Sequence, residues 1–590
     1  MQARKMKLKS SALFLVMFLF AGNVLAQRTI TGTVTESNGD PLIGASVLVK
    51  GTSQGTSTNL DGKYTLSVSN DAKVLVFRSV GKETQEVTIT GNTIDVILLD
   101  NQKVLDEVIV IGYGTTKKKD ITGSVATVKA EDIAAVPVTS ISEALTGKLA
   151  GVQITTTEGS PDAEVKIRVR GGGSITGDNA PLYIVDGFPV SSINDIAPND
   201  IEDITVLKDA SSTAIYGSRG AGGVILVTTK KGKEGKLAVN YNAYVGYKKI
   251  AKKLDVLSTF DYSKWQYELA LLKNDGKTDS YEKYFGIYND MDLYNDIEYN
   301  DWQDIVFGRT GNTFNHSLSL SGGTEKAKFS FNYSHINDKA IMQMSNFKRD
   351  NLSLKFNYRP VKKITLDFST RFASTGINGG GANEQNEKSS ADSRLKYAVI
   401  YYPFPIKDLT DTGSDDTEDS KLYQPLTAIS DNDNQVKRIT FNMAGSLGWE
   451  IINNLKFKTE VGYDDYRNNN NRFYGATTYY SQNLSNLSNL TVAGLPAIIL
   501  TNTARNAIRN TNTLNYDFKK ILNKDHNLSV MVGQEYIIQH ENELTMNIQG
   551  FPKFFSSDDA FKLTTQGLYP ASTDYYYSPD DKLLSFFGRA

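Results

Sequence analysis

The stretch LDEVIVIGYG, residues 105–114, divides the chain into two parts of different character. Within it, Val108 to Ile111 form an apolar run of β-branched residues that follows Glu107 and ends at a Gly-Tyr-Gly breaker, and such a run favours a β-strand. The charged segment KKKD at 117–120 follows. A strand tethered in this way, with open backbone groups, can be completed by another protein through β-augmentation. The alternative is an ordinary edge strand of a neighbouring domain.

Residues 1–26 have the pattern of a secretory signal peptide. A basic start is followed by an apolar run from Ala12 to Gly22 and by small residues before Gln27, where we expect the mature protein to begin. The apolar run is too short for a membrane helix, and no later stretch reaches the roughly 18 to 20 apolar residues that such a helix needs. If the protein lies in a membrane, the sequence therefore predicts a closed β-barrel.

Composition and motifs argue against several classes of function. The chain contains no cysteine, which excludes disulfides, thiolate metal sites and cysteine nucleophiles, and its formal net charge of -2 gives no basic field for nucleic acid. The four histidines form no H-E-x-x-H motif, and no phosphate-binding glycine loop is present. A G-x-S-x-G motif surrounds Ser53, but it lies between two expected strands, whereas a catalytic elbow needs a strand-to-helix turn. We therefore predict no enzyme, no cofactor and no metal.

Residues 28–100 contain short β-prone runs separated by turn signals such as Asn38-Gly39 and Asp61-Gly62. The expected strands are 30–34, 45–49, 64–68, 74–77, 86–89 and 94–98. Six or seven short strands in about seventy residues predict a small β-sandwich.

Residues 120–231 change to a mixed α/β pattern. Ser140 and Glu143 fit a capping box for a helix that Gly151 ends, and Asp209 fits the cap of a second, short helix. The apolar face of the first helix would consist of Ile141, Ala144, Leu145 and Leu149. Strands are expected at 165–170, 182–185, 204–207 and 224–228. The first of these strands alternates strictly, so its Lys166, Arg168 and Arg170 form a basic face.

After Lys236 the hydrophobic period becomes two. Apolar and aromatic residues alternate with Asn, Ser, Thr, Lys and Asp in runs at 237–245, 314–320, 329–335, 352–358, 364–372, 439–449, 455–463, 514–518 and 528–532. Tight turns at 322–325, 359–363 and 452–454 contrast with long, polar connections of irregular sequence at 251–312, 374–437 and 468–505. Short connections at one end and long ones at the other are typical of an outer-membrane barrel, whose apolar face meets lipid. Alternation alone would equally fit a soluble sandwich.

The amino-acid sequences of several segments are specific enough to indicate a resemblance to a known family. The first unit, from GTVTESNGDPLIGASVLVKG onward, resembles the carboxypeptidase-regulatory-like domain. The segments EVIVIGYGTTKKKDITGSV, ALTGKLAGVQI, PLYIVDGFPV and ITVLKDASSTAIYGSRGAGGVILVTTKKGK closely resemble the SusC/RagA family of TonB-dependent outer-membrane transporters. One departure is Lys82, where the regulatory-like domain often has an aromatic residue.

The resemblance implies a domain order. It comprises a signal peptide at 1–26, a β-sandwich at 27–103, a TonB box and linker at 104–119, a plug domain at 120–233 and the first part of a large antiparallel outer-membrane β-barrel at 234–590. The TonB-binding residues would be Glu107, Val108, Ile109, Val110 and Ile111, and the family's signature segment would be 181–190. Arg168 and Arg170 would hold the plug against acidic residues of the barrel wall; the alternative is that they contact substrate. Asp186 is expected to form a turn before Gly187, and the alternative is a ligand for substrate.

The implied function is active import of large nutrients, either oligosaccharides or peptides. The implied partners are TonB in the periplasm, a SusD-like lipoprotein at the cell surface and outer-membrane lipid. Plugged barrels have about 22 strands, and we count only about ten, so the sequence predicts a truncated barrel. A structural or adhesive surface protein is the alternative, and an exported hydrolase is a third hypothesis.

Overall fold

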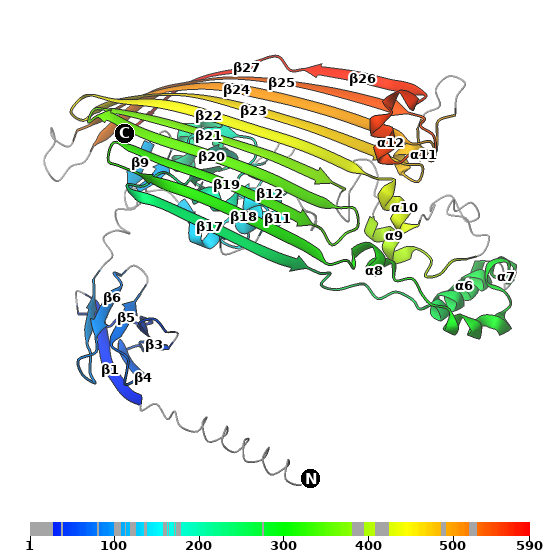
Figure 1. Cartoon of the computed structure of the whole chain (residues 1–590), viewed down its shortest axis with the longest axis horizontal. Helices are drawn as coiled ribbons and strands as arrows, with labels where there is room; N and C mark the ends of the chain where they lie inside the picture. Colours follow the sequence, from blue (N-terminus) through cyan, green and yellow to red (C-terminus); the bar gives the residue numbers. More distant parts are fainter. Residues whose placement is uncertain are drawn as a thin grey trace, which may run out of the picture. The chain divides into compact units, whose positions relative to one another are not determined.

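The structure is a computed structural model of the whole chain (Figure 1). It describes residues 27–36, 39–52, 54–79, 82–99, 108–111, 114–117, 125–134, 138–156, 162, 165–169, 171–172, 179–273, 277–379, 394–406, 424–484, 491–518 and 528–590. The chain forms two compact units, one with residues 1–109 and 115–122 and the other with residues 110–114 and 123–590. No helix in the described ranges is long and apolar enough to cross a membrane. The expected signal peptide, 1–26, lies outside the described residues.

The first unit contains two small sheets, one of strands β4-β1-β7 and one of strands β3-β2-β5-β6. The strands are β1 Gln27–Glu36, β2 Ser46–Val49, β3 Gly55–Ser57, β4 Lys63–Ser69, β5 Val74–Arg78, β6 Gln85–Thr88 and β7 Val96–Leu98. Along β4, Tyr64, Leu66 and Val68 are buried while their neighbours are exposed. Tyr64 donates a hydrogen bond to the Ile94 carbonyl, 2.9 Å away. The predicted β-sandwich is confirmed, and β3 is a strand that the sequence pattern did not show.

Two sequence features, Lys82 and the G-x-S-x-G motif, belong to this sandwich. Lys82 lies 2.9 Å from the Glu36 carboxylate and is largely buried, so an ion pair occupies the place where an aromatic side chain was expected. The G-x-S-x-G motif connects β2 to β3 without a helix, although Ser53 itself lies outside the described residues. The strand-to-helix turn of a catalytic serine is therefore not formed by the described residues on either side of it.

Replacing Phe77 with alanine is expected to destabilise the sandwich strongly. Phe77 is fully buried and packs edge-to-face on Tyr64, with ring centroids 5.6 Å apart. Removing such a ring leaves a cavity and costs about 3–5 kcal/mol. Because residues 27–100 carry their own core, the test uses that fragment alone, and urea unfolding measures the difference. Ile97→Ala is the control, because Ile97 is 57% exposed; equal losses for both variants would contradict the assigned core.

Strands β8 Val108–Ile111 and β9 Gly114–Lys117 pair with each other in a separate two-stranded sheet. Each strand of such a pair has one edge bonded to its neighbour and one edge that the sheet leaves open. The predicted docking strand therefore exists as a strand. Glu107, its first predicted residue, lies outside the described residues.

A five-stranded sheet of order β10-β15-β16-β13-β14 and a hairpin of β11 and β12 form an α/β body in the second unit. Its elements are β10 Val125–Lys129, α3 Ala130–Ala134, α4 Ile141–Ala144, β11 Val152–Thr156, β12 Val165–Val169, β13 Leu182–Val185, β14 Phe188–Val190, η2 Pro198–Asp200, β15 Ile201–Leu207, α5 Ala210–Thr213, η3 Ala214–Gly220 and β16 Val224–Thr229. β16 lies in the middle of the sheet, and all six of its residues are buried. This strand anchors the core of the body.

Helix α4, the first helix that the sequence predicted in this body, is shorter than expected. Ser140 caps it by accepting a hydrogen bond from the Ser142 N–H, so the predicted capping box with Glu143 does not form. The apolar residues expected on its face are nevertheless buried: Ile141, Ala144, Leu145 and Leu149. The predicted N-cap of the second, short helix, α5, is confirmed, because the Asp209 carboxylate accepts a hydrogen bond from the Ser212 N–H at 2.8 Å.

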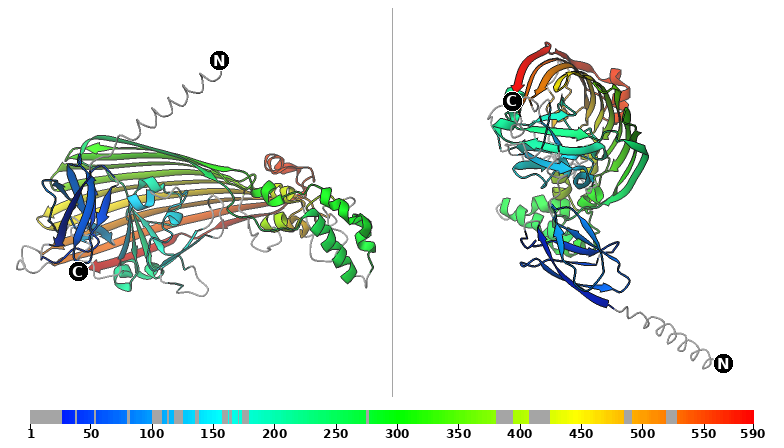
Figure 2. Two further views of the ribbon diagram at one scale, coloured as in Figure 1. Left: turned by 90° about the horizontal axis from the view of Figure 1, so that it is seen from below. Right: turned by 90° about the vertical axis from the view of Figure 1, so that its left-hand side faces the viewer.

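A large antiparallel sheet makes up most of the second unit and curves around the α/β body (Figure 2). Its strands are β17 Gly235–Lys248, β18 Gly311–Gly323, β19 Ala327–Lys339, β20 Asn346–Val361, β21 Ile364–Asn378, β22 Asn434–Ile452, β23 Leu455–Tyr474, β24 Ala497–Asp517, β25 Ser529–Gln549, β26 Tyr569–Tyr577 and β27 Asp581–Arg589. Each strand from β17 to β25 pairs with the next in the chain. β26 and β27 both pair antiparallel with β25, over 542–549 and 531–539 respectively, so they form two halves of one interrupted strand.

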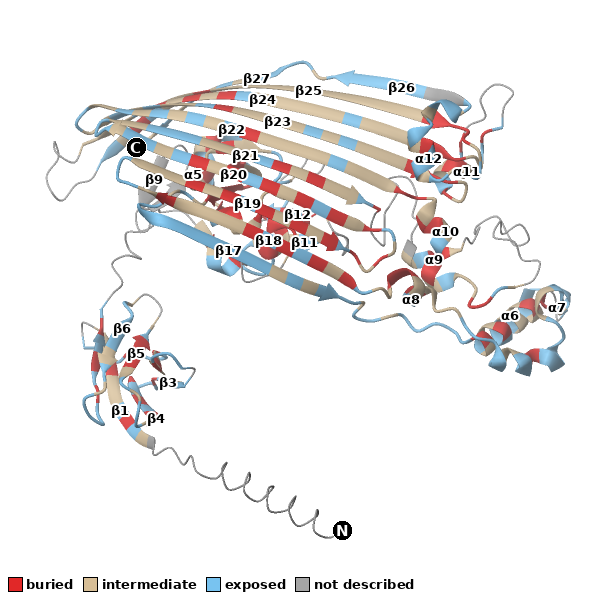
Figure 3. Cartoon of the chain, in the orientation of Figure 1, coloured by how far each residue is buried: buried red, intermediate tan, exposed pale blue. Residues whose placement is uncertain are grey.

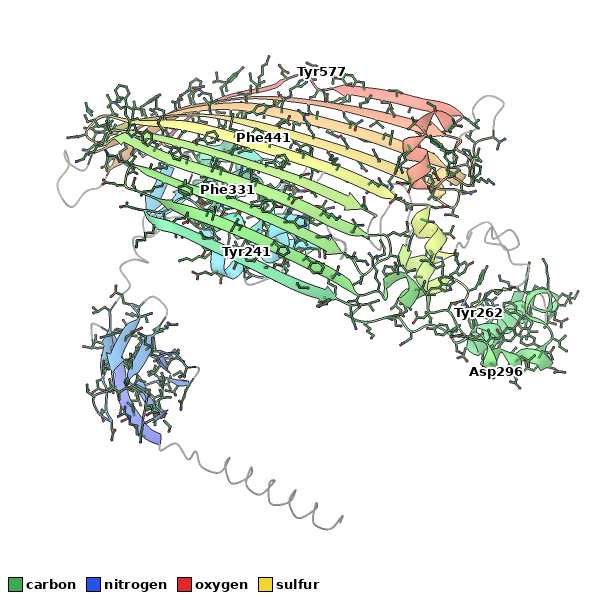
Figure 4. The ribbon with its side chains drawn as sticks, viewed as in Figure 1. Tyr241, Tyr262, Asp296, Phe331, Phe441 and Tyr577 are labelled. Atoms are coloured by element: carbon green, nitrogen blue, oxygen red, sulfur yellow. The ribbon has the colours of Figure 1, made fainter. Side chains whose placement is uncertain are left out.

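The sheet is polar inside and apolar outside. On β20, Arg349, Asn351, Ser353 and Lys355 are buried, whereas the alternating Leu352 and Phe356 are 39% and 43% exposed. Figure 3 shows buried residues along the middle of β18 to β20. Large side chains labelled in Figure 4, among them Phe331 and Phe441, belong to the outward rows. This arrangement reverses that of a soluble sandwich and fits a barrel wall whose outer face meets lipid.

The connections between the large strands differ at the two ends as predicted, and the described parts of the long ones contain helices. The expected connection 468–505 is shorter than predicted, because β23 continues to Tyr474 and β24 begins at Ala497. β18–β19, β20–β21 and β22–β23 are joined by tight turns. The long connections carry α6 Thr259–Lys273, α7 Asp279–Phe285, η4 Tyr288–Asp296, α8 Trp302–Phe307, α9 Arg394–Ile400, α10 Pro425–Ser430, α11 Tyr479–Gln482, α12 Ser557–Lys562 and η6 Thr564–Gln566. Aromatic contacts join separate loops, as between Tyr262 and Phe404, whose ring centroids are 6.2 Å apart.

Candidate functional site

The candidate site is the contact between the α/β body and the inner face of the large sheet. On the body it centres on the segment 186–195, which begins at the turn after β13, passes through β14 and continues toward η2. On the sheet it draws side chains from β20 to β24. The contact consists mainly of charged and hydrogen-bonding groups, and four of them recur below: Lys355, Arg371, Arg438 and Arg509.

Asp186 is the first anchor of the segment. It has a left-handed backbone with φ of 51°, as expected for a turn residue before Gly187. Its carboxylate accepts hydrogen bonds from the Thr229 N–H and hydroxyl at 3.0 and 2.7 Å, and it lies 2.9 Å from Lys355 Nζ and 3.6 Å from Arg371 Nη1. The turn role is confirmed, and an ion pair with the wall is added to it.

The electrostatics of Asp186 favour its charged form. Burial by itself raises the pKa of this carboxyl, but the charges of Lys355 and Arg371 and the hydrogen bond from Thr229 outweigh burial and lower the pKa to about 2. The contribution of this anchor to stability is therefore present above the unfolded pKa and is lost only as the pH falls toward 2.

Arg438 of β22 is the second anchor. Its guanidinium bonds two carboxylates of the body at once: Asp195 at 2.8–3.0 Å and Asp162 at 2.8 and 3.2 Å. All three side chains are less than one-fifth exposed. A planar fork that holds two carboxylates orients the body as well as attracting it.

Backbone carbonyls of the body provide a third set of contacts. Arg349 donates to the Asn194 and Thr139 carbonyls, and Asn351 donates to the Asp195 carbonyl. Arg349 is only 3% exposed. These bonds depend on the backbone path of the segment and little on its side chains, so they fix the position of the loop against β20.

Close packing at β14 adds steric definition. The Phe188 ring lies against Gly462 of β23, where a Cβ atom would come 2.2 Å from the ring. Arg509 of β24 covers the same ring, with its guanidinium 4.9 Å from the centroid, and donates to the Gly187 carbonyl and to Glu460. Only glycine at 462 leaves room for this contact.

We call the contact between the α/β body and the inner face of the large sheet the seam. The distribution of charges across the seam differs from the sequence-based prediction. Among the ion pairs between the described residues of the body and the wall, Arg219 with Glu535, at 2.9 Å, has its base on the body, whereas the others have their acids on the body and their bases on the wall. Arg168 lies on the exposed face of β12, and Arg170 lies outside the described residues. Their role as contacts with the wall stays a prediction. The residues of the observed seam were missed because its pairs join positions 126 to 322 residues apart.

A cavity of about 80 Å³ lies beside the seam, lined by the segment and by the wall, including Asp200, Arg371 and Asp464. Asp200 is 6% exposed, and its Oδ1 atom has no hydrogen-bond partner within the described residues. Burial raises the pKa of Asp200 to about 6, against the opposing effect of Lys230 and other cations. The cavity therefore holds an acid whose charge the fold tolerates poorly.

Asp200→Asn is expected to stabilise the protein at pH 7 to 8 and to have little effect at pH 4. Because the folded pKa is raised, the favourable contribution is present below the unfolded value and is lost as the pH rises through about 6. Two pKa units correspond to roughly 3 kcal/mol. Thermal melting against pH measures the difference, with Glu202→Gln as the control, because Glu202 is exposed on strand β15 of the same body. A stabilisation independent of pH would contradict the assignment.

Comparison with known families agrees with this architecture. Residues 30–110 match the CarboxypepD_reg-like domain, and residues 117–224 match the TonB-dependent Receptor Plug Domain. The α/β body is thus a plug domain, and the seam is its contact with the wall.

Relatives and solved structures extend the match over the large sheet. A TonB-dependent receptor of Formosa agariphila is 32% identical over 97% of this chain and 55% of that receptor. The TonB-dependent receptor SusC of Bacteroides thetaiotaomicron is 36% identical over 62% of this chain and 36% of SusC. A structure of the RagAB peptide importer aligns with a TM-score of 0.63 and 25% identity, covering 82% of this chain and 53% of that one.

The sandwich, the plug and the wall that is polar inside define a TonB-dependent receptor of the outer membrane. Within that class, the chain belongs to the SusC/RagA family. It spans about half the length of the curated relatives named here, or less.

Proposed function

We propose that the protein takes part in TonB-dependent import of large nutrients across the outer membrane. TonB would bind Glu107 to Ile111 from the periplasm, and a SusD-like lipoprotein would cover the transporter at the cell surface. Import of this kind needs no cofactor and no catalytic residue, because TonB would supply the energy as a mechanical pull on the bound strand. The observation that carries this proposal is the seam between plug and wall, which is charged and hydrogen-bonded.

The composition of the seam supports repeated release. Ion pairs such as Asp186 with Lys355 lose their mutual attraction on separation but regain hydration, so the separated surfaces remain soluble. An apolar contact of the same extent would expose surface that promotes misfolding. A plug that has to leave and re-enter its position in each cycle is better served by the polar seam.

Strand β8 supports the coupling to TonB. Main-chain pairing along an open strand edge transmits a pull through several parallel hydrogen bonds and requires little side-chain identity. Among the described strands, β8 pairs with β9 alone, so its other edge has no strand partner there. A strand of TonB would add to that edge or replace β9.

The cargo is an oligosaccharide or a peptide. SusC and the RagAB peptide importer do not decide between these for this chain. Growth of a strain on defined oligosaccharides and on defined peptides as the sole carbon source, with and without the gene, distinguishes them.

Deletion of Leu105 to Ile111 tests the import function against the alternative of a structural or adhesive surface protein. Import requires the segment, so uptake of the cognate nutrient should be lost while the amount of protein in the outer membrane stays unchanged. An adhesive role does not depend on it. Uptake at the wild-type rate after the deletion would refute the proposal.

A further inference from the structure

The outward face of the large sheet has an open notch on three strands that lie side by side, β20, β21 and β22 (Figure 1). Its floor is Gly376 of β21, which pairs with Lys348 of β20 on one side and with Lys437 of β22 on the other. We call these three residues the lysine notch. Because β21 ends at Asn378 and leads into the long connection before β22, the notch lies toward the extracellular end of the wall.

The lysine notch lies just beyond the apolar belt on each of its strands. On β22 the outward positions from Trp449 to Ile439 are apolar or glycine, and Lys437 is the next one. At about 3.4 Å per residue and a tilt of about 40°, this stretch spans roughly 26 Å of height, which is the full lipid-facing band of a barrel. On β20 and β21 the last outward apolar side chains are Leu352 and Phe372, each four residues from the notch. The notch is therefore at the level of the lipid headgroups.

The charges of the two lysines are not neutralised by the protein. Both side chains are exposed, and within the described residues neither ammonium group has an acidic partner. The outward carboxylate next to Lys348 on β20, Asp350, is bound instead by the Tyr333 hydroxyl at 2.9 Å and by His335 at 2.8 Å. Two strand spacings, roughly 10 Å, separate the lysine Cα atoms, which is about one Debye length, so their repulsion is only partly screened. An anion between the lysines would remove this repulsion.

The glycine leaves room for such an anion. A Cβ atom at position 376 would meet no other atom within 4 Å beyond its chain neighbours, and Gly376 does not have a left-handed backbone. Neither packing within the sheet nor backbone conformation therefore requires glycine here. Glycine weakens a strand interior, and it often marks a place where a ligand approaches the backbone closely.

We propose that the lysine notch binds the phosphorylated headgroup of a lipid in the outer leaflet. Lysine ammonium groups bind phosphate as point charges, and clusters of cations beside a membrane attract anionic lipids. A phosphate above Gly376 is within reach of both long side chains. The acyl chains of the same molecule would then lie on the apolar belt, which begins at Leu352 and Phe372, 39% and 37% exposed. A free anion would use the two charges and leave this apolar surface uncovered. The proposal is independent of the proposed import.

Native mass spectrometry of the protein produced from its own gene tests the proposal, with lipid A, dephosphorylated lipid A and inorganic phosphate as separate probes. Lys348→Gln combined with Lys437→Gln should weaken lipid A binding by about fivefold for each lysine removed. Lys362→Gln combined with Lys363→Gln is the matched control, because it removes the same charge from the tight turn between β20 and β21 at the opposite end of the sheet. This control should bind lipid A as the wild type does.

A second variant separates the shape of the notch from its charge. Gly376→Leu fills the notch and keeps both lysines, so it should also weaken lipid A binding. Gly445→Leu is its control, since Gly445 faces outward within the apolar belt of β22 and a Cβ atom there would lie 4.0 Å from the nearest atom outside its chain neighbours. The amount of each variant in the outer membrane is measured alongside and should not change.

The other outcomes would overturn the proposal. Equal binding of dephosphorylated lipid A would assign the contact to the apolar belt alone. Displacement of lipid A by inorganic phosphate at equal concentration would make the notch a site for free anions. A loss in the control pair as large as that in the notch pair would show a general effect of charge. Unchanged lipid A binding together with a change in oligomeric mass would assign the notch to a contact between proteins.

Discussion

Proline at Val108 or Val110 is expected to abolish uptake while the protein still reaches the outer membrane. Proline removes a backbone donor and cannot take part in continuous strand pairing. Because β8 is only four residues long, one proline affects the pairing of the whole strand. Loss of the docking strand removes the only mechanical input that the proposed import has.

The pair of β8 and β9 supplies a matched control. Thr115→Pro and Thr116→Pro lie on β9, so they disturb the same small sheet without changing the backbone donors of β8. If β8 is the docking strand, these variants should retain much of the uptake that the β8 variants lose. Growth on the cognate nutrient and the amount of protein in purified outer membranes are the two measurements. Equal loss from both strands would assign the function to the intact hairpin, and growth of the β8 variants would remove the docking strand altogether.

The sequence predicted the parts of the fold that follow from local periodicity. Sandwich strands such as β4 and wall strands such as β20 alternate between the two faces, so their type and orientation could be assigned without a structure. The signal weakens where both faces are polar. β24 runs from Ala497 to Asp517, but the pattern identified only 514–518, because Thr511 faces inward and Asn510 and Asn512 face outward in the stretch before it.

Other differences arise from tertiary structure. The long loop before β18 appeared irregular because α6 places apolar residues on opposite sides, with Ala270 buried and Leu272 80% exposed. The seam could be predicted only in part. Asp186 was identifiable from its turn chemistry, but its partners Lys355 and Arg371 lie in distant strands, and no local pattern links them to it. A basic strand in the plug suggested basic plug residues against an acidic wall, whereas most of the pairs described here have the opposite polarity.

Arg438→Ala is expected to loosen the plug from the wall and to make the outer membrane permeable to large solutes. The substitution leaves Asp162 and Asp195 close together, poorly solvated and without their shared cation. Removing one member of a buried ion pair costs about 3–5 kcal/mol, because the remaining charge keeps its desolvation penalty. This is a large part of the stability of a typical domain.

Two measurements separate this effect from general misfolding. Trypsin should cleave the plug of the Arg438→Ala protein faster than that of the wild type, and cells should become sensitive to an antibiotic too large for ordinary porins. Arg467→Ala is the control, since Arg467 is 67% exposed on the neighbouring strand β23 and pairs only with Asp465 in the described structure. Asp162→Asn combined with Asp195→Asn should largely restore protease resistance to Arg438→Ala, because the repelling charges are then gone. If the triple variant is as sensitive as Arg438→Ala alone, the loss comes from packing of the arginine side chain, and the electrostatic account of this anchor is wrong.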